Sequence, residues 1–306
     1  MCSHNKCYYW TIRNAICFSM AGTDLIVWWD GSGNNVWRKS VGDEMKRTRT
    51  TLDITAFPEK IAMFVTGATI YDSSCSEAST VYFIDKGQGF YLKVASTGYL
   101  KPEALMHPYF HSLGLTSDLL LYEKTHEKDY LITERIPGED CTHEQYLSDP
   151  ERLCDTLAET LRMLHNQPIE NCPIKNRRDW CFRSVINGYC DGKYEHDLFE
   201  GMWEFSSDQE AWSAARYALG SMEENVLMHG DYCLPNIILD DWKFSGFIDL
   251  INAGVGDRHF DVLWGIWTLN FNLHTTHYTD RFIDAYGREL IDQEKLRCFA
   301  AMEMFL

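Results

Sequence analysis

Two apolar runs, residues 81–84 and 90–94, flank a short polar stretch that contains Gly87 and Gly89. Both runs are rich in β-branched and aromatic residues, and a glycine-containing connection of this length is typical of a β-hairpin. The pattern therefore predicts a hairpin over residues 81–94.

After this hairpin, the sequence predicts a helix, a further strand and a hinge. Residues 102–113 have Pro102 at their first turn and Gly114 just beyond their end, which predicts a helix. A short apolar run over 130–133 predicts a strand, and the Ile-Pro-Gly sequence over 136–138 indicates a hinge between two lobes.

After this hinge, the spacing of apolar residues becomes helical. One stripe predicts an amphipathic helix packed on a core, and it consists of Leu153, Leu157, Leu161 and Leu164. We interpret His165, at the end of this helix, as structural. A second short hairpin is expected over 237–248, and residues 259–306 are again expected to be helical.

The first 44 residues differ from the rest. They hold four tryptophans and three cysteines with weak periodicity, and a plausible fresh start lies at Met45. We therefore expect an extension of doubtful structure over 1–44, an N-terminal nucleotide-binding lobe over 45–135, and a C-terminal catalytic and substrate-binding lobe over 136–306.

Charge narrows the classes of partner. The chain has 45 acids and 28 bases, a formal charge of −17, which disfavours nucleic acid and anionic membranes and favours a cationic ligand. An acidic surface that only maintains solubility explains the same number. The 11 cysteines include no C-x-x-C pair, which indicates reduced thiols and a cytoplasmic protein. No apolar run reaches the length of a membrane span, and we expect a monomer or weak dimer.

The candidate chemistry centres on His229-Gly230-Asp231, with Asn236 five residues after the aspartate and Asp249 at the end of the next predicted hairpin. Phosphoryl transfer requires a carboxylate to orient the attacking hydroxyl and hard oxygen ligands for Mg²⁺. Asp231 suits the first role, and Asn236 and Asp249 suit the second. The alternative is that Asp231 caps a turn and Asp249 ends a strand.

Kinase chemistry also requires a lysine on the phosphates of the nucleotide. Lys93 lies in an apolar strand, where an unpaired lysine is costly, and Glu103 follows in the next predicted helix. Alternate residues of a strand share a face, so Tyr91 points the same way as Lys93 and could stack on adenine. Tyr91 could equally be a core aromatic. The hydroxyl-rich loop over 72–80, with Ser76, could cover the phosphates or be an ordinary loop.

These motifs resemble the aminoglycoside 3'-phosphotransferases, the kanamycin kinases, over about residues 57–305. The matching segments are 91–93, 103–104, 136–138, 229–236, 245–250 and 257–261. The resemblance implies an α+β, protein-kinase-like two-lobe fold, with a small β-rich N-lobe and a larger, mainly helical C-lobe. It also implies ATP, with GTP possible, held by backbone atoms near Glu134 and Ile136, and Mg²⁺ on Asn236 and Asp249.

The same resemblance implies transfer to the 3'-hydroxyl of a kanamycin- or neomycin-type aminoglycoside, with acids that receive its ammonium groups. The candidates are Glu200, Glu204 and Glu303, each of which could instead be a solvated surface glutamate. Phe271 and Asn272 stand where some family members have an acidic pair. Two alternatives therefore stay open: a kinase of the same fold for another small hydroxylated metabolite, and a catalytically inactive nucleotide-binding regulator.

Overall fold

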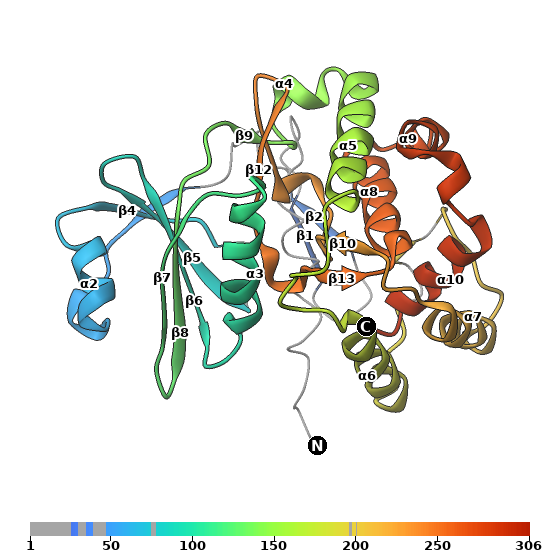
Figure 1. Ribbon diagram of the computed structural model, residues 1–306, viewed down its shortest axis with the longest axis horizontal. Helices are drawn as coiled ribbons and strands as arrows, with labels where there is room; N and C mark the ends of the chain where they lie inside the picture. The colour runs from blue at the N-terminus through green and yellow to red at the C-terminus, as the bar shows by residue number, and fades with distance from the viewer. Residues whose placement is uncertain (1–25, 30–34, 39–46, 75–77, 196–197, 200) are drawn as a thin grey trace. The chain divides into compact units, whose positions relative to one another are not determined.

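The computed structural model describes residues 26–29, 35–38, 47–74, 78–195, 198–199 and 201–306 (Figure 1). Its contacts divide the chain into two compact units. The first comprises Met1–Leu147 and Ile237–Ile251, and the second comprises Ser148–Asn236 and Asn252–Leu306. Sheet dominates the first unit and helix the second, which confirms the predicted α+β class. Among the described residues, no helix is both long and apolar enough to span a membrane.

A six-stranded antiparallel sheet forms the centre of the first unit. Its strand order is β3-β4-β5-β6-β8-β7. The bounds are β3 (Thr48–Thr50), β4 (Thr69–Asp72), β5 (Ser79–Asp85), β6 (Phe90–Ser96), β7 (Leu119–Lys124) and β8 (Lys128–Glu134). β5 and β6 are the predicted hairpin, and positive φ angles at Gly87 and Gly89 allow the chain to turn between them.

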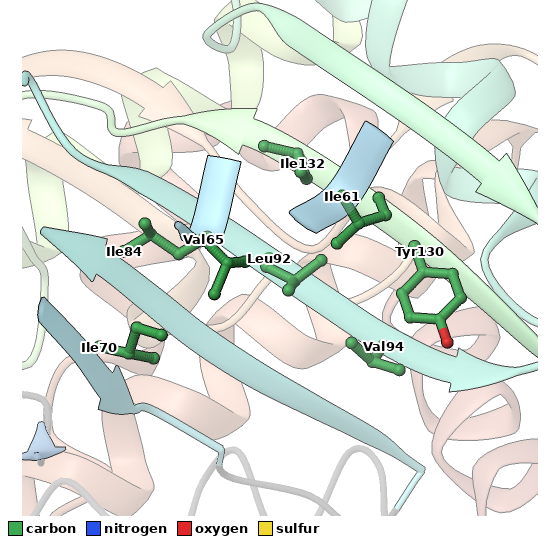
Figure 2. Close-up of a cluster of buried hydrophobic side chains, with 8 residues drawn as sticks. All are labelled: Ile61, Val65, Ile70, Ile84, Leu92, Val94, Tyr130 and Ile132. Carbon is green, nitrogen blue, oxygen red and sulfur yellow. The ribbon is translucent and has the colours of Figure 1, made fainter. Parts of the chain in front are cut away.

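Two helices cover opposite faces of this sheet (Figure 1). On one face, α2 (Glu59–Val65) contributes Ile61 and Val65 to a buried cluster with side chains of β4, β5, β6 and β8, shown in Figure 2. On the other face, α3 (Lys101–Ser112) begins beside a second cluster that includes Leu100 and Leu131. The alternation of strand side chains thus separates an apolar core from the face that carries Lys93.

A small three-stranded sheet joins distant parts of the sequence within the first unit. Its order is β12-β11-β9, and its bounds are β9 (Glu139–Asp140), β11 (Ile237–Asp240) and β12 (Lys243–Phe247). The Tyr146 hydroxyl of α4 (Glu144–Leu147) donates to the carbonyl of Leu239 at 2.8 Å, and the Thr116 hydroxyl donates to that of Phe247 at 2.8 Å. The hairpin over 237–248 therefore belongs to the unit that contains the large sheet, and the predicted lobe boundaries stay a prediction.

The described part of the first unit also contains a two-stranded antiparallel sheet and short 3-10 turns. The sheet pairs β1 (Ile26–Trp29) with β2 (Asn35–Arg38). The turns are η1 (Ile54–Ala56) and η3 (Leu250–Asn252), the second of which continues into the other unit.

Helices form most of the second unit. Their bounds are α5 (Pro150–His165), α6 (Arg177–Cys190), α7 (Asp208–Ser221), α8 (Arg258–Leu273), α9 (Thr279–Tyr286) and α10 (Gln293–Glu303). The remaining elements are η2 (Leu234–Asn236), η4 (Arg288–Leu290) and a pair of strands, β10 (Val226–Met228) with β13 (Gly254–Gly256). Each residue of the predicted leucine stripe on α5 is fully buried, which confirms the amphipathic helix.

Candidate functional site

Lys93, which is largely buried, and Glu103, which is almost fully buried, form an ion pair in the first unit. Lys93 lies on β6 between the core residues Leu92 and Val94, so its side chain points to the face on which α3 packs. Its ammonium nitrogen lies 2.9 Å from Oε2 and 3.1 Å from Oε1 of Glu103. A lysine in an apolar strand thus obtains the carboxylate partner that its burial requires.

Asp249 contacts the same lysine. The Lys93 ammonium is 2.9 Å from Oδ1 of Asp249, which follows β12. The backbone of Asp249 has a φ of 58°, a left-handed conformation that costs free energy for a residue other than glycine. Such conformations concentrate at functional sites, and here the conformation accompanies the contact with Lys93.

These carboxylates determine the protonation of Lys93. Burial alone would lower the pKa of Lys93, but the charges of Asp249 and Glu103 outweigh burial and raise this pKa above its ordinary value. The ammonium is therefore kept at every physiological pH. His107, one helical turn after Glu103, is affected in the opposite direction: burial, reinforced by the charge of Lys93, lowers its pKa to about 4.

Asp129, which the sequence analysis did not identify, positions the helix that carries Glu103. Its carboxylate is buried and accepts a 3.0 Å hydrogen bond from the backbone N–H of Leu100, the N-cap residue of α3. The Tyr122 hydroxyl donates to the same oxygen at 3.1 Å. An acid in a strand gives no sequence signal for this role, because its partners are distant in the chain.

The candidate adenine-binding residues, Tyr91, Glu134 and Ile136, differ in burial and in the groups that they contact. Tyr91 is half-buried on β6, and its ring centroid lies 5.2 Å from that of Phe83. The backbone carbonyl of Glu134 accepts a 2.8 Å hydrogen bond from the Ser117 hydroxyl. Ile136 is buried.

Two other predicted residues, Ser76 and Glu200, lie outside the described residues.

Asp231 lies in a buried loop of the second unit that Asp261 of α8 holds. The carboxylate of Asp261 accepts backbone N–H groups from His229 at 2.7 Å and Gly230 at 2.8 Å. His165 lies 3.2 Å from the same carboxylate through Nε2 and 2.7 Å from the Tyr286 hydroxyl through Nδ1. His165 is therefore structural, as expected, and it fixes the carboxylate that fixes the loop.

Asn236 binds Asp231 directly. Its side-chain nitrogen donates to Oδ2 of Asp231 at 2.9 Å and to the backbone carbonyl of Asp231 at 3.0 Å. Because the nitrogen makes both bonds, the amide oxygen is the atom through which Asn236 could bind a cation. Gly230 has a φ of 77°, and a Cβ there would overlap the backbone of Asn252. The loop therefore requires glycine beside Asp231.

Glu303 and Glu204, the two described candidates for substrate recognition, differ in burial. Glu303, at the end of α10, is 3% exposed, and its Oε1 has no hydrogen-bond partner among the described residues. Burial, together with the charge of Asp231, raises the pKa of Glu303 to about 8. Glu204 is exposed. Of these two candidates, Glu303 is the one that lies in the interior, where no cationic side chain among the described residues pairs with it.

As metal ligands, Asn236 and Asp249 suit Mg²⁺ better than an ion that needs a full set of protein ligands. Within the described ranges, no group of three or more His, Cys, Asp or Glu side chains could hold a metal. Mg²⁺ is commonly bound by one or two protein oxygens, with phosphates and water completing the shell. The amide oxygen of Asn236 and the carboxylate of Asp249 are hard ligands of this kind.

Comparison with known proteins agrees with this chemistry. The profile of the phosphotransferase enzyme family matches residues 72–299. A probable aminoglycoside 3'-phosphotransferase of Lactococcus lactis is 44% identical over 254 residues, which cover 83% of this chain and 97% of the relative. The chain therefore belongs to the phosphotransferase enzyme family and, as the sequence predicted, to its aminoglycoside 3'-phosphotransferase branch.

Solved structures extend the agreement to the fold. An aminoglycoside 3'-phosphotransferase of type VIII has a TM-score of 0.61 and 23% identity, and the match covers 74% of this chain and 88% of that one. A Streptomyces rimosus aminoglycoside phosphotransferase in complex with ADP and streptomycin has a TM-score of 0.59 and 20% identity, and the match covers 74% and 90%. The fold is the predicted protein-kinase-like fold.

Proposed function

We propose that this protein transfers the γ-phosphoryl group of ATP to the 3'-hydroxyl of a kanamycin- or neomycin-type aminoglycoside, which would confer resistance to the antibiotic. In this reaction a bond forms between the hydroxyl oxygen and the γ-phosphorus, and the bond to the β-phosphate oxygen breaks. ADP leaves, and the hydroxyl proton passes to a base. The observation that carries the kinase part is the largely buried Lys93 ammonium, paired with Glu103 and Asp249.

Each recurring role in phosphoryl transfer has a candidate residue here. We assign Asp231 as the base that orients the hydroxyl and accepts its proton. Lys93, held by Glu103, binds phosphate oxygens and stabilises their charge. Asn236 and Asp249 would hold Mg²⁺, which neutralises phosphate charge when it is bound. Tyr91, with the backbone near Glu134 and Ile136, would contact the base, and the loop containing Ser76 would cover the phosphates.

The substrate assignment has separate support. The Lactococcus relative is named for an aminoglycoside, and the Streptomyces structure contains ADP and streptomycin. The chain carries a formal charge of −17, which favours a polycationic ligand. We propose that Glu303 receives an ammonium group of the substrate, with Glu200 and Glu204 as further candidates.

A second candidate function is a kinase of the same fold for another small hydroxylated metabolite. The observation in its favour is the position where some relatives have an acidic pair. There the ring of Phe271 stacks on Trp267 with centroids 4.9 Å apart, and the Asn272 amide donates to the carbonyl of Thr268 at 2.7 Å. Neither side chain offers a negative charge to an ammonium group.

A nucleotide-coupled assay separates these functions. The purified protein is given ATP or GTP with a panel of aminoglycosides and, in parallel, with choline, homoserine, a simple sugar and a macrolide. The Asp231→Asn variant, purified identically, controls for contaminating ATPases, and NMR of the product identifies the phosphorylated hydroxyl. We expect ADP release with kanamycin or neomycin and modification at the 3' position. Turnover only with another panel member would support the second function.

A further inference from the structure

Arg47, just before the edge strand β3, contacts two aromatic side chains of the large sheet. Its guanidinium carbon lies 4.1 Å from the ring centroid of Phe83 and 6.0 Å from that of Tyr91. Its Nη2 donates a 2.8 Å hydrogen bond to the hydroxyl of Tyr91. Arg47 thus combines a cation–π contact with a directional hydrogen bond.

These contacts lie on the face of the sheet that carries Lys93. Phe83 is directly opposite Tyr91 in the pairing of β5 with β6, and Val81 is opposite Lys93. Tyr91 and Lys93 alternate with Leu92 and Val94, which point into the core shown in Figure 2 on the other face. The arginine is therefore beside the residues to which we assign nucleotide binding.

The pairing of β3 with β4 brings Arg47 to this position. Thr48 lies opposite Asp72, and Thr50 lies opposite Ile70. The match to the family profile begins only at residue 72, so Arg47 lies outside the segment that defines the family. Arg47 therefore has no role assigned by the match to the family profile.

We propose that Arg47 is a nucleotide-positioning residue, which acts through Tyr91. The planar guanidinium packs on Phe83 and holds the Tyr91 hydroxyl, so the Tyr91 ring is oriented before the base of the nucleotide reaches it. A side chain that is ordered in advance loses less conformational entropy on binding. This inference rests on the proposed use of ATP.

The test compares Arg47→Ala with a matched variant of the same strand. Arg49→Ala removes the same charge from an exposed residue of β3, which lies opposite Tyr71 of β4. We expect Arg47→Ala to raise KM for ATP about two- to fivefold, the size of an exposed cation–π contact. The kcat and the KM for the aminoglycoside should be unchanged, because Lys93 and Asp231 are intact. Arg49→Ala should resemble the wild type in all three constants.

A double-mutant cycle with Tyr91→Phe shows whether Arg47 acts through the hydroxyl. Tyr91→Phe removes the acceptor and keeps the ring, so it should raise KM for ATP, and adding Arg47→Ala should then have little further effect. Thermal unfolding without nucleotide shows that each variant is folded. Arg47→Lys keeps the charge without the planar fork and should recover only part of the loss.

Three results would overturn the inference: an unchanged or lower KM for ATP in Arg47→Ala, equal effects of Arg47→Ala and Arg49→Ala, or full additivity with Tyr91→Phe. Failure of the proposed function is recognised separately, from the wild type. A wild-type protein that ATP does not stabilise against thermal unfolding would overturn both proposals. A wild type that binds ATP but phosphorylates no aminoglycoside would leave the ATP-induced stabilisation of the variants as the deciding measurement for Arg47.

Discussion

The two units treat their buried charges in opposite ways. In the first, the Lys93 ammonium lies 2.9 Å from the carboxylates of both Glu103 and Asp249, so opposite charges stabilise each other. In the second, the charge of Asp231 adds to burial and raises the pKa of Glu303 to about 8. The ion-paired group around Lys93 stays charged because opposite charges lie side by side. In the pair of buried acids, Asp231 and Glu303, Glu303 is instead protonated at neutral pH. The first arrangement suits a polyanion with its metal, and the second suits a cation.

Asp249→Ala is the strongest test of the ion-paired group, which consists of Lys93, Glu103 and Asp249. We expect turnover to be abolished, because the variant loses one partner of Lys93 and one hard oxygen ligand of Mg²⁺. Added Mg²⁺ should not restore activity. Asp240→Ala, which removes an exposed aspartate from the same hairpin, serves as the control and should remain active. Steady-state rates over a range of Mg²⁺ measure both, and full wild-type activity in excess EDTA would contradict the metal assignment.

Asp231→Asn tests the pair of buried acids, Asp231 and Glu303. We expect turnover to fall about 10²–10⁴-fold, the range for loss of a positioned base, while ATP binding stays nearly intact. The substitution also removes the negative charge that adds to the burial of Glu303. Turnover is measured by ADP release and ATP binding by calorimetry. A variant with more than about a third of wild-type turnover would exclude Asp231 as the base.

Glu303→Gln tests the protonated acid through the pH dependence of stability. The native state holds the Glu303 proton up to a pH of about 8, whereas the ordinary value is 4.5. Between these values the native state binds more protons than the unfolded state, so rising pH destabilises the wild type through this group. The stability of Glu303→Gln relative to the wild type should therefore increase from pH 5 to pH 8. Urea unfolding at the two pH values measures this difference.

The same variant also tests recognition of the substrate. Glu303→Gln should raise KM for kanamycin more than it changes KM for ATP, because Gln cannot supply a charge to an ammonium group. For the urea unfolding experiment above, Glu204→Gln is the matched control. Glu204 is exposed, so this variant should show no comparable pH dependence of stability. Equal kanamycin constants for wild type and Glu303→Gln would remove Glu303 from the binding site.

Deletion of residues 1–44 should have the smallest effect. In the part of this segment that the structure describes, β1 pairs with β2 in a two-stranded sheet of their own. The deletion keeps Arg47 and every candidate residue of both groups. We therefore expect unchanged kinetic constants and an unchanged unfolding temperature when the chain starts at Met45. Loss of soluble expression would show that the segment stabilises the rest of the protein.

The sequence predicts local features well and distant partners poorly. Lys93 could be matched with Glu103 because a lysine in an apolar strand requires an acid and the next helix supplies one. The anchoring of the His229–Gly230 backbone by Asp261 depends on residues about thirty positions apart, and nothing in the local pattern of either segment indicates it. The burial of Glu303 was equally hidden, since a glutamate near the end of a chain is usually exposed.

The discontinuous first unit has a consequence for dividing the gene. A cut between Leu147 and Ser148 would leave β11 and β12 on the second fragment, although β11 pairs with β9 on the first. The second fragment would thus carry a strand that completes the sheet of the other and supplies a carbonyl for the Tyr146 hydroxyl. Such a pair of fragments has a built-in means of reassembly through strand addition. Reconstitution of the proposed aminoglycoside kinase activity from two separately expressed fragments would then report when the fragments meet.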